Sequence, residues 1–142
     1  GRSGGGVKRK DASGARAAGL PAAPTVSPAD GPVVVQKAYD LALWLLRKVE
    51  GFPRSYRFSV GDRIVSGALD LLLLLVEAAY RSDKASSLAE ASRRVNALRF
   101  LLRLANDLHL VSRDSYLHAS GLLDEVGRMV GGWAKASAGA RA

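Results

Sequence analysis

Apolar residues recur at three- and four-residue steps across residues 33–142, and this spacing constrains the fold more than any other feature of the chain. Such spacing places apolar side chains on one face of an α-helix. No segment shows the strict alternation of apolar and polar residues that is typical of a half-buried strand. We therefore expect an all-α fold.

Four helical segments follow one another with short connections. We expect helices over residues 33–50, 59–80, 83–109 and 113–136. Gly51 and Pro53 end the first, because Gly accepts left-handed geometry and Pro cannot continue the hydrogen-bond ladder. Ser59 with Asp62 resembles a capping box, and Ser112 is the expected N-cap of the fourth helix. The pattern predicts an up-down-up-down four-helix bundle.

Each expected helix carries a row of residues that should face the core. The rows are Val35, Ala38, Ala42, Leu45, Leu46 and Val49; Ile64, Val65, Ala68, Leu69, Leu72, Leu73 and Val76; Leu88, Ala91, Val95, Leu98, Leu102 and Ala105; and Ala119, Leu122, Val126, Met129 and Trp133. Further apolar residues, such as Leu41, Leu43 and Phe100, lie outside these rows. A small bundle should keep one wet face per helix, so this excess predicts self-association. Gly127, inside the fourth helix, predicts close approach of a neighbouring backbone or bulky side chain.

The first 32 residues differ in composition from the remainder. Gly, Ala, Ser and Pro dominate them, and they contain no aromatic residue. Such a segment buries too little apolar surface to offset the entropy of ordering. We expect a flexible basic tail over residues 1–32 and a bundle domain over residues 33–142. Lys8, Arg9 and Lys10 form either a nucleic-acid-binding arm or part of a plain linker.

Composition excludes several classes of site. The chain has no Cys and two His, which excludes disulfides, Cys-ligated zinc and thiol nucleophiles and leaves little for a catalytic triad. The longest apolar run, residues 71–76, is far shorter than the roughly 18 residues of a membrane span. Lys and Arg exceed Asp and Glu by 21 to 13, a formal net charge of +8. We expect a cytoplasmic protein with an anionic partner, no membrane, and no catalytic residue, metal or cofactor.

Arginine predominates among the basic residues, and it binds phosphate in bidentate fashion. The candidates for nucleic-acid contact are Arg54, Arg57, Arg93, Arg94, Arg99, Arg103 and Arg128. Around Arg54 and Arg57, two interpretations remain open. Phe52 and Phe58 interleave with these arginines as in surfaces that stack on unpaired bases, or they plug the end of the bundle while Arg57 pairs with a carboxylate such as Asp62.

The alternative for the third helix is a solvated face or an intersubunit ion-pair network. Glu125 and Arg128 are three residues apart, a spacing that favours a salt bridge over a catalytic pair.

Three motifs carry a family resemblance. Residues 98–104 read LRFLLRL, residues 125–133 read EVGRMVGGW, and Pro53 with Arg54 follows the first helix. Over residues 36–136 the chain resembles the accessory variability determinant (Avd) proteins of diversity-generating retroelements. These belong to a wider four-helix family that includes proteins encoded in intervening sequences of bacterial 23S rRNA genes.

The resemblance implies a non-enzymatic homopentamer shaped like a tapered barrel or ring, encoded by a prokaryote or phage. Its implied partners are a reverse transcriptase and a structured retroelement RNA or RNA/cDNA hybrid. The complex would make adenine-mutagenised cDNA for retrohoming. Carried over by position, five of the candidate arginines would contact RNA or polymerase, an inference that rests on their charge: Arg54, Arg57, Arg99, Arg103 and Arg128. Glu125, Gly127 and Trp133 would be structural.

Two alternative functions remain. One is an rRNA-linked or other protein-interaction oligomer whose basic surface binds an acidic partner. The other is a HEPN-like, metal-independent ribonuclease, because Arg113 with His118 and Arg103 with His109 fit the loose R-x(4–6)-H pattern. A structural interpretation places His109 at a helix C-terminus and His118 partly buried in a core or interface.

Overall fold

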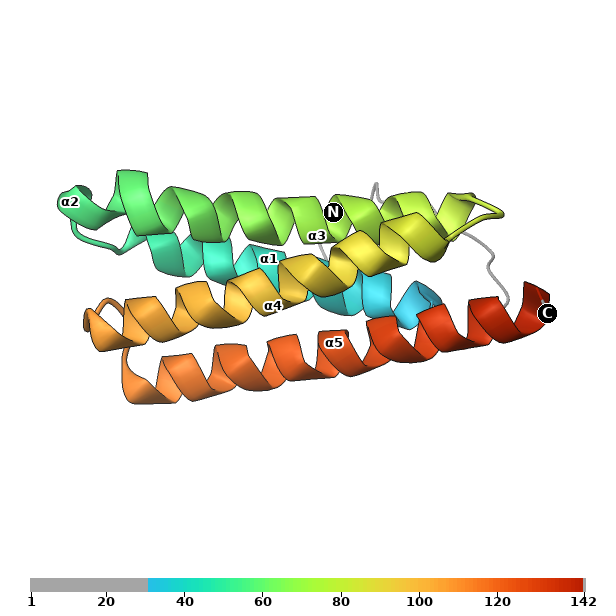
Figure 1. Cartoon of the computed structure of the whole chain (residues 1–142). Helices are drawn as coiled ribbons and strands as arrows, with labels where there is room; N and C mark the ends of the chain where they lie inside the picture. The colour runs from blue at the N-terminus through green and yellow to red at the C-terminus, as the bar shows by residue number, and fades with distance from the viewer. Residues whose placement is uncertain (1–30, 142) are drawn as a thin grey trace, which may run out of the picture.

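The computed structural model describes residues 31–141, and Figure 1 shows them as a bundle of long helices. The elements are α1 (Gly31–Glu50), α2 (Arg54–Tyr56), the π-helical turn η1 (Arg57–Gly61), α3 (Asp62–Tyr80), α4 (Ala85–Asp107) and α5 (Arg113–Arg141). No strand occurs in this part of the chain. Both α3 and α5 pack against α1 and against α4, so the four long helices form a closed square. The predicted all-α four-helix bundle is confirmed.

The core row of α4 is as predicted, and all six of its residues are buried. In α1 the row is shifted, because Val34 and Leu41 are buried while Val35 and Leu46 are only half-buried. In α5 the side chains of Leu123 and Val130 replace Leu122 and Met129 in the core. The predictions fail where adjacent positions are both apolar, since spacing alone does not choose between them.

The largest correction concerns α3. Leu71 and Leu75 are buried, whereas the predicted core residues Leu69 and Leu73 are 38% and 62% exposed. The uninterrupted run over residues 71–76 offers apolar side chains in every direction, so it does not specify which face turns inward. The packing of α1 and α4 makes that choice.

The second helical segment begins earlier than predicted. The amides of Tyr56 and Arg57 donate to the carbonyl of Pro53, and helical structure then continues through η1 into α3. The capping box at Ser59 is wrong, because its hydroxyl donates to the Ser55 and Tyr56 carbonyls inside the continuous turn. The N-cap at Ser112 is confirmed by a hydrogen bond of 3.1 Å from the Ser115 amide to the Ser112 hydroxyl.

The link from α4 to α5 is a Schellman motif. The amide of Leu110 donates to the Ala105 carbonyl at 2.9 Å, and the amide of His109 donates to the Asn106 carbonyl at 3.0 Å. His109 occupies the left-handed position that Gly usually fills, with φ of 59°. This agrees with the structural interpretation that placed His109 at a helix C-terminus.

Polar contacts join α5 to both of its neighbours. Lys37 of α1 pairs with Glu125 at 3.2 Å, so the salt bridge predicted at Glu125 is interhelical, and no ion pair joins Glu125 to Arg128 within residues 31–141. From α4, the Arg99 Nε donates to Asp124 Oδ1 at 3.2 Å. The same guanidinium lies over Gly127, where an added Cβ would be 2.9 Å from its Nη2 atom. The predicted close approach at Gly127 is confirmed, and the approaching group is a side chain.

Replacing Gly127 with Leu should destabilise the bundle. The new side chain would collide with Arg99 and, at 3.3 Å from the first added carbon, with Val95. Overpacking of this kind costs about 1–3 kcal/mol. The free energy of unfolding, measured in urea, checks this. Gly121→Leu is the matched control, since nothing lies within 4 Å of a Cβ there and its stability should be unchanged or slightly higher. Equal losses in both variants would contradict the packing argument.

Candidate nucleic-acid interface

Basic side chains gather at the end of the bundle where α1 and α4 finish and α5 begins, the end at which Figure 1 labels α2. One small hollow is lined by Phe52 from the turn after α1, Ile64 of α3, Leu102 of α4 and Ala119 of α5, which shows that these parts of the chain converge. We call this region the basic end. Its basic residues are Arg47, Lys48, Arg54, Arg57, Arg63, Arg103 and Arg113.

None of these seven residues forms an ion pair within residues 31–141. The ion pairs found within residues 31–141 lie along the sides of the bundle, away from the basic end. The segments of the basic end carry four acidic residues, Glu50, Asp62, Asp107 and Asp114, against seven basic ones. The basic end therefore has excess positive charge that no neighbouring carboxylate neutralises through direct contact.

Arg57 has a structural role at the basic end. Its guanidinium donates to the carbonyls of Glu50 at 3.2 Å and Phe52 at 3.4 Å. Glu50 is the last residue of α1 and Phe52 lies just beyond it. A cation at this position is also stabilised by the negative end of the helix dipole. The suggested pairing of Arg57 with Asp62 does not occur. Arg57 thus holds the η1 turn against α1.

Phe52 and Phe58 have different environments. Phe52 is buried and plugs the end of the core, as one interpretation predicted. Phe58 is 65% exposed, so the same interpretation is wrong for it. It lies in η1 between Arg57 and Ser59, and Arg54 is one helical turn away. The basic end therefore presents an open aromatic ring close in sequence to two arginines.

Three of the other candidate arginines lie in ion pairs on the sides of the bundle. Arg93 pairs with Glu90 at 2.6 Å, and Arg94 lies 3.0 Å from Glu90 and 3.5 Å from Asp70. Arg99 pairs with Asp124, as described above.

Arg128 is exposed on α5 and forms no ion pair within the described chain. Of the seven candidates, the structure thus brings Arg54, Arg57 and Arg103 together at the basic end and leaves the other four elsewhere.

Four residues of the basic end were not among the candidates for nucleic-acid contact: Arg47, Lys48, Arg63 and Arg113. Arg113 was considered beside His118 as a ribonuclease residue. The signal was available, since all four flank the connections that an up-down-up-down bundle places at one end. Within a single helix, spacing shows which charges share a face. These four residues lie near the ends of different helices and become neighbours because the antiparallel topology brings those ends together.

Away from the basic end, the carboxylates of Glu77 and Glu90 are held in their charged form. A hydrogen bond of 2.6 Å from Arg81 is the main cause of a lowered pKa at Glu77, and the hydroxyl of buried Ser87 adds to it. The pKa of Glu90 is lowered chiefly by its hydrogen bond from Arg93. Positive charge is therefore compensated along the α3 and α4 sides and uncompensated at the basic end.

The Glu77 contacts predict a pH dependence. Because the folded-state pKa is below its ordinary value, the stabilisation is present at neutral pH and is lost as the pH falls through the lowered pKa. Glu77→Gln should therefore lower the urea midpoint at pH 7, and the difference from the wild type should vanish once the pH falls below the lowered pKa of Glu77. Glu50→Gln is the control, because its carboxylate has no ion pair within residues 31–141 and should show no such difference. If the urea midpoint of Glu77→Gln stays below that of the wild type in acid, the stabilisation does not come from the charged carboxylate of Glu77.

The two histidines have different environments. His109 is fixed in the cap of α4. His118 is exposed, so the expectation of partial burial in the core is wrong, while a position between subunits stays a prediction; its ring lies 5.2 Å from that of Trp44 on α1. Among residues 31–141 no group of three His, Cys, Asp or Glu side chains could hold a metal ion. No helix in this range is long and apolar enough to cross a membrane.

Comparison with solved structures supports the fold. A crystal structure of a protein of unknown function from the S23 ribosomal protein family of Bacteroides thetaiotaomicron aligns with a TM-score of 0.69. The two sequences are 17% identical, and the alignment covers 75% of this chain and 98% of that chain. At this identity the likeness concerns the fold alone. No curated protein matches the sequence.

The bAvd-like family model matches residues 32–137, and the chain belongs to this family. Proteins of this Avd-like kind are accessory and non-catalytic. The resemblance seen in the three sequence motifs is thereby confirmed.

Proposed function

We propose that this chain is the accessory protein of a diversity-generating retroelement, binding its reverse transcriptase and structured RNA through the basic end. In this role it assists primed, adenine-mutagenic cDNA synthesis and retrohoming without catalysing a step itself. The observation that carries the proposal is the gathering of seven basic residues without ion pairs at one end of a bAvd-like protein.

Phosphate binding would supply the anionic partners that these residues do not find among the carboxylates of residues 31–141. Each cation that neutralises a phosphate releases a counterion, so affinity depends steeply on salt. The guanidinium groups of Arg54 and Arg103 offer forked donors for phosphate oxygens. The exposed ring of Phe58 can stack on a base that is not paired. Recognition then depends on RNA shape and unpaired loops, with phosphates supplying most of the affinity.

The proposed assembly is a ring-shaped or barrel homopentamer. A cyclic ring of five needs a heterologous interface, in which two different surfaces of each subunit meet. Two exposed apolar rows on different helices supply candidates. Leu69, Leu73 and Tyr80 lie on α3, and Phe100 and Leu104 lie on α4. A ring built from them would bring five basic ends into one assembly.

Removing positive charge at the basic end should weaken RNA binding. Arg54→Gln with Arg103→Gln removes two candidate phosphate contacts and should reduce the slope of log affinity against log salt by about 2. Fluorescence anisotropy with a labelled structured RNA at several salt concentrations measures both quantities. The charge-matched control is Arg81→Gln with Arg93→Gln, since both residues pair with carboxylates and should matter little.

An equal loss in both double variants would mean that net charge, and not the basic end, drives binding. A wild-type protein that binds no RNA at any salt concentration would favour the alternative of an interaction oligomer with an acidic protein partner.

The two apolar rows also predict how assembly fails. Leu73→Asp and Phe100→Asp should each dissociate the oligomer, because each leaves one surface of every interface charged. Mixing the two variants should restore one productive interface and give a heterodimer. Light scattering measures the masses. If the variants keep the wild-type mass, or if mixing restores nothing, the heterologous interface is not built from these rows.

A further inference from the structure

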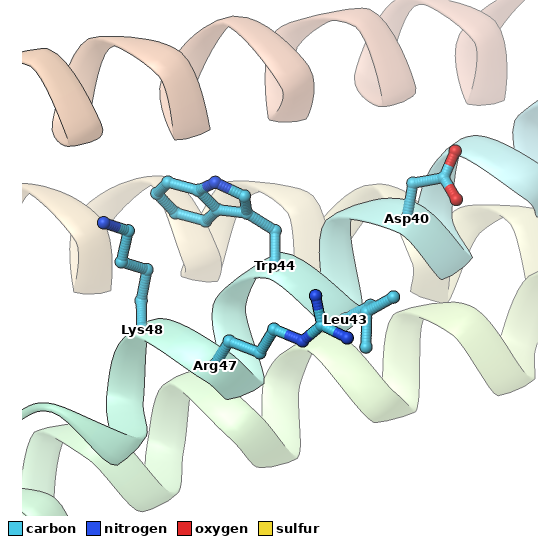
Figure 2. Close-up of a pocket in the computed structure, with 5 residues that line it drawn as sticks. All are labelled: Asp40, Leu43, Trp44, Arg47 and Lys48. Atoms are coloured by element: carbon cyan, nitrogen blue, oxygen red, sulfur yellow. The ribbon is translucent and has the colours of Figure 1, made fainter.

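The outer surface of α1 carries a hollow of about 450 Å³. Asp40, Leu43, Trp44, Arg47 and Lys48 line it, and Figure 2 shows them along two turns of the helix. Leu43 and Trp44 supply apolar surface, and the other three residues supply charge.

Trp44 is half-buried and held in position by its neighbours. Its ring centroid lies 5.2 Å from that of His118 on α5, with the ring planes tilted by 49°. The Lys48 ammonium lies 5.2 Å from the indole centroid. His118 and Lys48 are both exposed, and the lysine side chain is long and flexible. The indole is thus fixed at one edge of the hollow, with part of its surface accessible.

Positive and negative side chains lie on opposite sides of the hollow. Arg47 and Lys48 have no carboxylate partner within residues 31–141, and Figure 2 shows the Lys48 ammonium on the side of Trp44 away from Asp40. Asp40, at the opposite side, accepts a hydrogen bond of 3.0 Å from the Gln36 amide. The hollow therefore offers two cations, an aromatic ring and, farther along the helix, a carboxylate acceptor.

We infer that this hollow binds one unpaired nucleotide of a single-stranded RNA segment. Its base stacks on Trp44, its phosphate meets Arg47 and Lys48, and Asp40 accepts a hydrogen bond from an N–H group of the base. Lys48 moves aside from the indole to meet the phosphate. The inference rests on the proposed RNA-binding function and deepens it, because Arg47 and Lys48 belong to the basic end.

Single-stranded RNA fits this hollow better than a duplex or an acidic peptide. In a duplex the faces of the bases are stacked on one another and are hidden from a side chain. An acidic peptide would satisfy the two cations, but its carboxylates would be repelled by Asp40 and would leave the indole without a planar partner. Base stacking on an aromatic residue is also tolerant of sequence, as a scaffold for long RNA requires.

The full chain offers a direct fluorescence test, because it contains two Trp residues and Trp133 is completely buried. A change in tryptophan emission on adding RNA therefore reports chiefly on Trp44. The probes are an eight-nucleotide oligoadenylate and an abasic ribose-phosphate oligomer of the same length. Oligoadenylate should quench the emission and bind more tightly than the abasic oligomer.

Two substitutions separate stacking from structure. Trp44→Leu should weaken oligoadenylate binding by about 5- to 150-fold, the loss of one stacked base, and should leave binding of the abasic oligomer unchanged. Trp44→Phe keeps an aromatic face and should retain most of the affinity. Arg47→Gln should weaken binding of both oligomers, whereas Arg93→Gln, at an ion-paired position, should affect neither.

The inference is overturned if Trp44→Leu binds oligoadenylate as the wild type does while structured RNA still binds through the basic end. It is also overturned if Trp44→Leu or Trp44→Phe changes the oligomer mass, because Trp44 would then lie between subunits. If the wild type binds neither structured RNA nor oligoadenylate, the proposed function itself fails.

Discussion

The structure depends on the burial of one apolar face from each of four antiparallel helices. Leu41, Leu71, Leu98 and Trp133 come from different helices, and each is almost completely buried in the shared core. The connections between successive long helices are short, apart from the helical turns that lead into α3. Antiparallel packing with short links leaves little freedom in which helix ends meet, so the core also decides which charges become neighbours.

The same constraint organises the electrostatics. Along the sides of the bundle, charged residues at helix seams find partners across or within helices, as Arg94 does with Asp70 and Lys37 with Glu125. At the basic end the helices terminate, and neither Arg54 nor Arg63 forms an ion pair with a carboxylate of residues 31–141. Individual surface pairs contribute little to stability. The main consequence of these ion pairs is therefore that they leave unpaired positive charge at the basic end, where α1, η1, α4 and α5 meet.

Sequence patterns were sufficient for the fold class and for α4, because one apolar row runs without interruption from Leu88 to Ala105 along that helix. Phe100 and Leu104 lie outside this row and are exposed. The patterns were insufficient for α3, where consecutive leucines leave the inward face undefined and where Leu73 was placed on the wrong side. The start of the second segment was also wrong. Ser59 has the features of a helix cap, but the Pro53 carbonyl already accepts the first helical hydrogen bonds.

For the candidate site, residue type alone did not separate arginines that hold the bundle together from those that face solvent. Arg99 and Arg103 are one turn apart on α4 and look equivalent in the sequence. In the structure Arg99 covers Gly127 and pairs with Asp124, whereas Arg103 has no ion pair within the described chain. The difference arises from which helix lies opposite each residue, and such information is absent from a single periodic segment.

An even number of antiparallel helices places the start of α1 and the end of α5 at the same end of the bundle, away from α2 and η1 (Figure 1). Whatever the chain carries before Gly31 or after Arg141 is therefore attached on the far side from the seven basic residues. The two ends of the described chain and the seven basic residues thus lie at opposite poles of the bundle.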